Sequence, residues 1–210
     1  MDLQIKQNLQ QGVEQLALNL TQKQIDQLSY LLSQLLKWNK TYNLTAITEA
    51  DEALKLHLLD SLAIVPYWTF RKTLDVGTGP GFPGLPLAIA LPELEFHLLD
   101  SNSKKIRFIR QQIHELGLTN VTPHHARVEA FQSEVYDCVV SRAFASLKDM
   151  LQMTQHLVAQ DGCWMAMKGE YLPSELEEIP KWAKEVNTYR LSVPKLNAKR
   201  CIIQLAQRND

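Results

Sequence analysis

Residues 74–86 read Leu-Asp-Val-Gly-Thr-Gly-Pro-Gly-Phe-Pro-Gly-Leu-Pro, and no other stretch of the chain is as informative. A β-type run over Thr73–Val76 leads into glycines at positions 77, 79 and 81, and Gly84 precedes an apolar stretch that can form a helix. Glycine is needed where the backbone takes a positive φ or comes into contact with a ligand. A strand, a glycine-rich turn and a helix N-terminus together form the cradle by which α/β proteins bind a nucleoside-bearing cofactor.

Length and composition limit the classes of protein that the chain can belong to. Its 210 residues, 45% of them hydrophobic, predict one core domain with room for a small appendage. No run of about 18 apolar residues occurs, so we expect no membrane span and no membrane partner. The polar segment 1–10 does not fit a signal peptide, which favours a cytoplasmic protein. The three cysteines are scattered and odd in number, which indicates buried thiols and neither a disulfide framework nor a metal site.

The first part of the chain is predicted to be helical. Thr21 opens a helix with Gln24 three positions on, which is a capping-box pattern. Of three helices expected in this part, the one opened by Thr21 is the second, and the third runs from Thr48 to Leu62, before Pro66. We therefore divide the chain into an N-terminal helical cap or subdomain, residues 1–66, and a core domain, residues 67–210.

From Thr73 onward the pattern changes to an alternation of strands and helices, which predicts a mostly parallel sheet with helices on both faces. The predicted strands are Thr73–Val76, Glu95–Leu99, Val121–His124, Tyr136–Ser141, Cys163–Lys168, Thr188–Val193 and Cys201–Ala206. The predicted helices are Leu85–Leu91, Ser103–Leu116, Ala126–Gln132, Leu147–Val158 and Pro173–Lys184. Only seven residues separate the last two strands, too few for a helical crossover, so these strands should pair as an antiparallel hairpin.

A closing hairpin separates two α/β classes that share the glycine turn. It is the layout of class I S-adenosylmethionine (SAM)-dependent methyltransferases, whereas an NAD-dependent oxidoreductase would continue with parallel units. Asp75, before Gly77 and Gly79, can meet the cationic amino group of a methionine moiety directly or through water. Asp100 ends the second strand, where a carboxylate can accept both ribose hydroxyls. The run Arg127-Val128-Glu129 follows the third strand, where it can read an adenine edge.

The segment after the fourth strand bears on the substrate. Residues 141–146 read Ser-Arg-Ala-Phe-Ala-Ser. They contain neither the Asn/Asp-Pro-Pro-aromatic motif of enzymes that methylate exocyclic amines nor the proline-linked cysteine of enzymes that methylate cytosine carbon. Methylation of an amino group or of a carbon is therefore disfavoured.

Several motifs in combination resemble the RsmG family, the bacterial 16S ribosomal RNA guanine-N7 methyltransferases, also called the glucose-inhibited division protein B family. They are the glycine stretch from Asp75, Ser141–Ser146, Met167-Lys168-Gly169, the segment 38–45 and His57-Leu-Leu-Asp-Ser61. The resemblance runs from about residue 35 to the C-terminus. It implies a guanine substrate in the decoding-region loop of 16S rRNA and SAM contacts at Gly77, Phe82, Val128, Glu129 and Arg142. Many relatives have leucine at the position of Phe82.

Methylation at N7 suits the residues present. Guanine N7 has an in-plane lone pair and no proton, so no general base is expected, and catalysis rests on orientation. Arg142 is the first choice to orient the cofactor or donate to O6, with a structural salt bridge as the alternative. Asn43, His57 and Ser61 would approach the same pocket from the helical cap, although a helical histidine is also a common core residue. Lys168 can meet a phosphate.

Four cations lie within residues 104–110, among them Lys104, Lys105 and Arg107. They occupy the polar side of a predicted helix, either as RNA-phosphate contacts or as a solvated surface. We expect a monomer whose partner is 16S rRNA, as the small ribosomal subunit or an assembly intermediate. The alternatives are a class I methyltransferase on another substrate and a non-catalytic, ribosome-associated nucleotide-binding protein.

Overall fold

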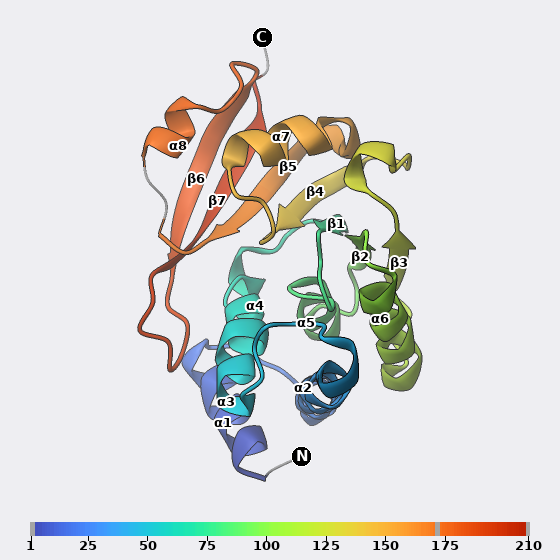
Figure 1. Cartoon of the computed structure of the whole chain (residues 1–210). Helices are drawn as coiled ribbons and strands as arrows, with labels where there is room; N and C mark the ends of the chain where they lie inside the picture. Colours follow the sequence, from blue (N-terminus) through green and yellow to red (C-terminus); the bar gives the residue numbers. More distant parts are fainter. Residues whose placement is uncertain (1–2, 171–172, 209–210) are drawn as a thin grey trace.

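The computed structural model describes residues 3–170 and 173–208, so the outer ends of the two predicted segments lie outside the described residues. The chain forms a seven-stranded sheet in the order β3-β2-β1-β4-β5-β7-β6 (Figure 1). The strands are β1 (Lys72–Val76), β2 (Glu95–Asp100), β3 (Val121–His125), β4 (Tyr136–Ser141), β5 (Val158–Lys168), β6 (Ala183–Leu191) and β7 (Arg200–Gln207). Strands β1 to β5 are parallel, and β7 pairs antiparallel with both β5 and β6. The predicted mostly parallel sheet with a closing hairpin is confirmed.

Helices cover both faces of the sheet (Figure 1). Near α5 and α6 lie the N-terminal helices, and α7 and α8 lie on the opposite side (Figure 1). The α-helices are α1 (Leu3–Gln15), α2 (Gln22–Tyr42), α3 (Ala50–Ala53), α4 (Asp60–Leu62), α5 (Gly84–Ala90), α6 (Ser103–Leu116), α7 (Leu147–Thr154) and α8 (Ser174–Glu177). A π-helical turn, Leu54–Leu59, joins α3 to α4, and 3-10 turns occur at Val65–Tyr67, Val128–Ala130 and Gln155–Leu157. None of the described helices is both long and apolar enough to cross a bilayer.

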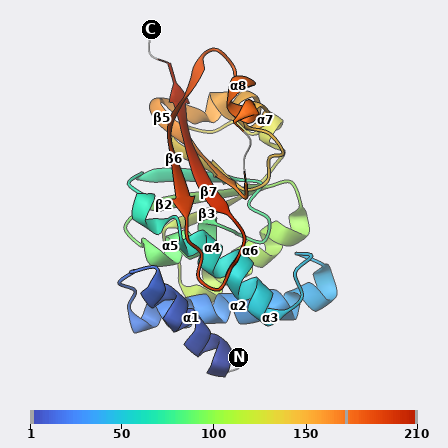
Figure 2. The same ribbon diagram turned by 90° about the vertical axis from the view of Figure 1, so that its left-hand side faces the viewer.

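The apolar core runs without interruption across residue 66. Leu28 and Leu54 from the N-terminal helices belong to the same buried cluster as Leu85 of α5 and Phe108 of α6. Helix α2 packs on α5 and α6, and α4 packs on α5. The boundary at residue 66 stays a prediction, and in space the two segments share one core. The long strands β6 and β7 extend from the C-terminal end of the molecule down toward α4 (Figure 2).

Local sequence signals place two of the long helices. At the start of α2, the Thr21 backbone N–H donates to Gln24 Oε1 at 2.8 Å and the Gln24 N–H donates to Thr21 Oγ1 at 3.3 Å, so the predicted capping box is confirmed. Helix α6 has the predicted bounds because Asn102 caps its start and Gly117 ends it at a φ of 64°. Glycine tolerates this left-handed conformation without a steric penalty.

Four predicted helices differ from the structure. The helix expected over Leu147–Val158 ends at Thr154, and a 3-10 turn leads from it into β5 at Val158. The helix expected over Pro173–Lys184 is only the short α8, because Pro180 cannot continue a helix and the chain enters β6 at Ala183. The helix expected over Ala126–Gln132 is a single 3-10 turn. The third N-terminal helix is interrupted by the π-helical turn at Leu54–Leu59, a feature often found near functional sites.

The glycine stretch has the conformation that its composition predicts. Gly77, Gly79 and Gly81 have φ values of 67°, 63° and 100°. Gly84 is required for a different reason, since an added Cβ would lie 2.8 Å from Leu98 Cγ and 2.9 Å from Asp75 Oδ2. The start of α5 therefore rests directly on β1 and β2, and this contact fixes the loop above the sheet.

Substituting Gly84 by alanine is expected to lower the free energy of unfolding by about 1–3 kcal/mol, because the new methyl group overpacks the contact with Leu98 and Asp75. Urea denaturation measures the change. Gly169→Ala is the matched control, because its Cβ would meet nothing closer than 3.6 Å. Equal stability of the two variants would contradict the close approach.

Candidate functional site

Two cavities lie along the carboxyl edge of the parallel strands and share Gly77 and Ala143. The larger has a volume of about 480 Å³ and the smaller about 230 Å³. In open α/β sheets this edge, where neighbouring loops diverge, is the usual ligand site. Together the two cavities form one groove with the glycine loop at its centre.

Two carboxylates hold the glycine loop in place. Asp75, at the end of β1, accepts hydrogen bonds at Oδ2 from Thr78 Oγ1 at 2.6 Å and from the Gly84 backbone N–H at 2.8 Å. Asp100, at the end of β2, accepts at Oδ2 from the Gly79 N–H at 2.9 Å. The loop is thus fixed from below and from the side before any ligand binds.

The smaller cavity has a lining suited to a nucleoside. Asp100 lies on one side, with its Oδ1 accepting from the Asn102 N–H at 2.8 Å, and a carboxylate oxygen has lone pairs for further donors. Val128 and Glu129, in the 3-10 turn after β3, line the same cavity. An added Cβ on Gly77 would lie 2.7 Å from Ala143 Cβ, so glycine keeps the passage between the two cavities open. These residues fit the adenosine half of SAM.

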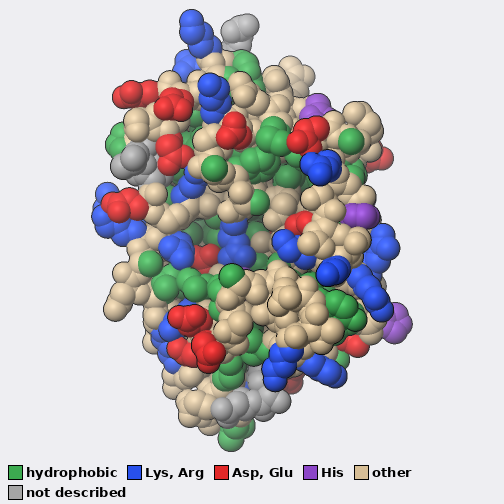
Figure 3. All heavy atoms as spheres, in the orientation of Figure 1, with side chains coloured by type: hydrophobic (Ala, Val, Ile, Leu, Met, Phe, Trp, Pro, Cys, Tyr) green, Lys and Arg blue, Asp and Glu red, His purple; other side chains and the backbone are tan. Residues whose placement is uncertain are grey.

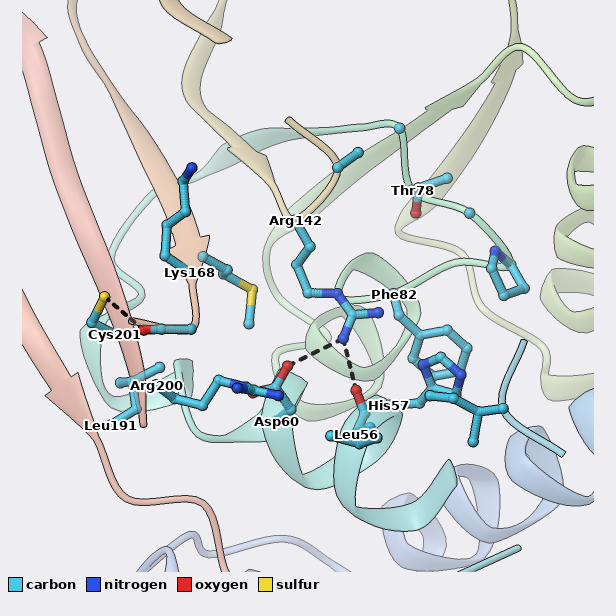
Figure 4. A pocket seen from close by; sticks show the side chains of 17 residues that line it. Leu56, His57, Asp60, Thr78, Phe82, Arg142, Lys168, Leu191, Arg200 and Cys201 are labelled. Carbon is cyan, nitrogen blue, oxygen red and sulfur yellow. Dashed lines mark hydrogen bonds and ion pairs between the residues drawn. The ribbon is translucent and has the colours of Figure 1, made fainter. Parts of the chain in front are cut away.

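An arginine–aspartate cluster lies in the larger cavity (Figure 4). Arg142, in the loop after β4, donates from Nη1 to the Leu56 carbonyl at 2.8 Å and to Asp60 Oδ2 at 3.2 Å. The Leu56 carbonyl belongs to the π-helical turn. Arg200, at the start of β7, donates from Nε to Asp60 Oδ1 at 3.1 Å. The neighbouring Ser141 Oγ donates to the Val76 carbonyl, and this bond fixes the end of β4 from which Arg142 extends.

His57 and Phe82 form one wall of the larger cavity. Their rings stack with centroids 4.8 Å apart, and both residues are buried (Figure 4). Burial first, and then the charge of Arg142, lowers the pKa of His57 to about 3. The ring is therefore neutral at physiological pH, and it pairs through Nε2 with Thr45 Oγ1 at 3.0 Å. Such a ring supplies an apolar face, not a proton acceptor of useful basicity.

On the face of Figure 3, basic side chains are scattered widely, and among them are those along α6 and near the ends of β4 and β5. Lys104 and Arg107 are exposed on α6, and Lys105 lies with its Nζ 4.0 Å from Asp100 Oδ2. Lys168 lines the larger cavity, where its Nζ donates to the Ala145 carbonyl and to Glu175 Oε2 at 2.8 and 2.9 Å.

The sequence matches the family model of rRNA small subunit methyltransferase G over residues 24–203. The chain belongs to this family. A ribosomal RNA small subunit methyltransferase G from Alteromonas mediterranea is 48% identical over 201 residues, which cover 95% of each chain. One from Hydrogenovibrio crunogenus is 53% identical over 175 residues, covering 83% of this chain and 81% of the relative.

Solved structures share the fold at low sequence identity. A TehB-like SAM-dependent methyltransferase from Corynebacterium glutamicum gives a TM-score of 0.57 at 14% identity, covering 86% of this chain and 99% of that one. TrmN from Thermus thermophilus gives 0.56 at 17% identity, covering 70% of this chain and 47% of that one. The sheet order and these neighbours confirm the predicted class I methyltransferase fold.

Three predicted site residues are placed differently by the structure. Asn43 is exposed, ends α2 in the left-handed region and lines a separate cavity beside Lys40 and Thr48. Ser61 is fully buried and donates to the carbonyl of His57 at 2.6 Å, one helical turn back. Asp75 lies beneath the glycine loop at 1% exposure and lines neither half of the groove. Here it braces the loop through Oδ2, and its contact with a cofactor amino group, direct or through water, stays a prediction.

Two residues of the site were missed by sequence reasoning. Asp60 was visible only as one letter of a helical motif, and Arg200 is 140 positions away along the chain. Their association depends on the antiparallel return of β7 next to β5, which brings the start of β7 to the carboxyl edge. A charged residue at the first position of the last strand was the available signal.

Asp75 gives the site a measurable pH dependence. Burial raises its pKa from 3.8 to about 6, although hydrogen bonds from Thr78 and Gly84 oppose the shift. The folded protein therefore binds more protons than the unfolded chain between these two values, and stability falls as the pH rises through them. Above about pH 6 the ionisation of Asp75 no longer changes the stability with pH.

We expect the free energy of unfolding of the wild type to fall by up to roughly 3 kcal/mol, relative to Asp75→Asn, between about pH 4 and pH 6. Urea denaturation of both proteins across this range measures the difference and cancels other titrating groups. A difference that stays constant with pH would show that the carboxyl group ionises normally in the folded state.

Proposed function

We propose that this chain transfers a methyl group from SAM to N7 of a guanine in the decoding-region loop of 16S rRNA. Family membership supports the reaction and the rRNA of the small subunit as substrate. The observation that carries the proposal is the groove itself. One half suits a nucleoside, and the other brings guanidinium groups and a stacked aromatic wall to the passage beside Gly77.

The residues of the smaller cavity would hold the cofactor. In this proposal Asp100 accepts the ribose hydroxyls, Val128 and Glu129 flank the adenine, and the backbone at Gly77 and Gly79 borders the methionine end. When bound, SAM supplies an electrophilic methyl group on a positively charged sulfur. Phe82 would support the methyl-bearing end of SAM from the wall of the larger cavity.

The residues of the larger cavity would orient the base. Guanine N7 attacks the methyl carbon, the new N–C bond forms as the S–C bond breaks, and the positive charge passes from sulfur to the purine. No proton moves in this step, so a neutral His57 that excludes water is compatible with catalysis by orientation. We propose that Arg142 donates to O6 of a base whose N7 faces the passage.

The phosphates beside the target would meet the basic side chains. We propose RNA contacts at Lys168 and along α6 at Lys104, Lys105 and Arg107. We propose no substrate contact for Ser61, which is buried, or for Asn43, which lines a separate cavity. The partner would be the small subunit or an assembly intermediate that holds 16S rRNA. We also propose that the chain acts as a cytoplasmic monomer.

The decisive experiment uses tritiated SAM and ribosomal RNA from a strain that lacks the activity. Intact small subunits, assembly intermediates and naked 16S rRNA form three arms. Methyl incorporation followed by borohydride and aniline cleavage, which is specific for N7-methylguanine, should give one cut in the decoding region. Label at a carbon or an exocyclic amine would overturn the N7 assignment, and SAM binding without incorporation in any arm would favour a non-catalytic protein.

Replacement of Asp100 tests the cofactor half of the groove. In Asp100→Asn one side-chain oxygen becomes an NH2 group, which faces either the Gly79 or the Asn102 N–H, so one acceptor is lost and the loop loses support. We expect SAM to bind about tenfold or more weakly, which corresponds to the loss of roughly 1–3 kcal/mol for an unsatisfied buried group. Calorimetry measures the affinity. Asp51→Asn, which removes an exposed carboxylate paired with Lys55, is the control and should bind SAM normally.

A further inference from the structure

Asp60 joins two guanidinium groups that reach it from different parts of the chain. Its Oδ2 pairs with Arg142 Nη1 at 3.2 Å and its Oδ1 with Arg200 Nε at 3.1 Å (Figure 4). The Asp60 side chain is 6% exposed, whereas each arginine side chain is 23% exposed. The carboxylate is therefore buried behind the arginines, and the arginines present part of their surface to the cavity.

The cluster lies where the larger cavity continues into another cavity. A cavity of about 540 Å³ at the β6–β7 hairpin shares Gly169, Leu191, Arg200 and Cys201 with it. The hairpin cavity also contains Arg190 and Lys199. Arg200 thus borders both cavities. An RNA strand that runs from the larger cavity along the β6–β7 hairpin would bring its phosphates past Arg200.

The charges of the cluster do not cancel. One carboxylate opposes two guanidinium groups, which leaves one positive charge in excess at a partly buried position. A guanidinium has five N–H donors, and the contacts to Asp60, Leu56 and Lys199 engage only one nitrogen of Arg142 and two of Arg200. Two such groups side by side match the oxygens of a phosphate.

We propose that Asp60 is a positioning residue for methyl transfer, which holds Arg142 and Arg200 together so that the pair binds one phosphate of the RNA strand beside the target guanine. Arg142 makes this contact with a nitrogen that its bonds to Asp60, Leu56 and O6 of the base leave free. The inference rests on the proposed function for the identity of the RNA. Without the carboxylate the two cations repel each other, and neither keeps its direction. Asp60 itself touches neither the RNA nor the cofactor.

A different role for the cluster is a structural one, in which Asp60 only ties α4 to β7 and to the loop after β4. Removing one partner of a buried ion pair destabilises a fold in either case. Stability alone therefore does not separate the two roles. The number of phosphates bound does, because each lost phosphate contact lowers the salt dependence of RNA binding by about one counterion.

The test compares Asp60→Asn, Arg200→Gln and the double variant with the wild type. Filter binding of the small-subunit RNA over a series of salt concentrations gives the slope, and single-turnover methylation at saturating SAM gives the half-saturating RNA concentration. We expect each single variant to raise that concentration about tenfold and to reduce the salt slope by about one. The half-saturating RNA concentration of the double variant should be no higher than that of the more impaired single variant, because both substitutions remove the same phosphate contact. SAM affinity should stay within about twofold.

Thr154→Val is the control for lost stability, since it removes the buried acceptor of the Trp164 indole N–H on the other side of the sheet. It should lower the melting temperature and leave the salt slope unchanged. The proposal is overturned if Asp60→Asn behaves in the same way, or if it weakens SAM binding instead of RNA binding. The two proposals fail separately. If the wild type binds the RNA but methylates no N7, the proposed reaction is wrong, and the salt slopes of the wild type and Asp60→Asn still test the role of Asp60 in phosphate binding.

Discussion

The site depends on the clamping of one glycine loop between two carboxylates that end neighbouring parallel strands. Asp75 holds the loop from below through Thr78 and Gly84, and Asp100 holds it from the side through Gly79. Because β1 and β2 are parallel and adjacent, their carboxyl ends bring both acidic side chains to the same edge. The loop then separates the groove into two halves with different chemistry. A preorganised backbone of this kind loses little entropy when a ligand binds.

The electrostatics of the groove follow from burial. Burial beneath the loop raises the pKa of Asp75 to about 6, and burial in the wall lowers the pKa of His57 to about 3, which keeps its ring neutral. The guanidinium groups of Arg142 and Arg200 share one buried carboxylate and stay partly exposed. The groove therefore offers oriented donors and apolar surface, and His57 in its wall is too weak a base to hold a proton at physiological pH. A reaction at a nitrogen lone pair, which releases no proton, is compatible with this arrangement.

Much of the fold was accessible from residue patterns because those patterns act locally. The bounds of α6 follow from Asn102 and Gly117, and β4 follows from a short apolar run. Predictions failed where a local pattern met a stronger constraint. Pro180 stops the helix expected before β6, and the π-helical turn changes which side chains of residues 54–62 face the groove. Ser61 points into the core and donates to a helix carbonyl, whereas Asp60 faces the arginines.

The glycine loop and the carboxylate at the end of β2 could be predicted because each depends on residues close together in the chain. The class of fold and the family followed from several such local patterns in combination. The charged groups that meet in the larger cavity could be identified only from the folded chain. Asp60, Arg142 and Arg200 come from an N-terminal helix, a loop after β4 and the last strand, and the order of the strands in the sheet brings them together. No local pattern encodes such a contact, because its energy is realised only after the sheet has formed and water has been excluded from Asp60.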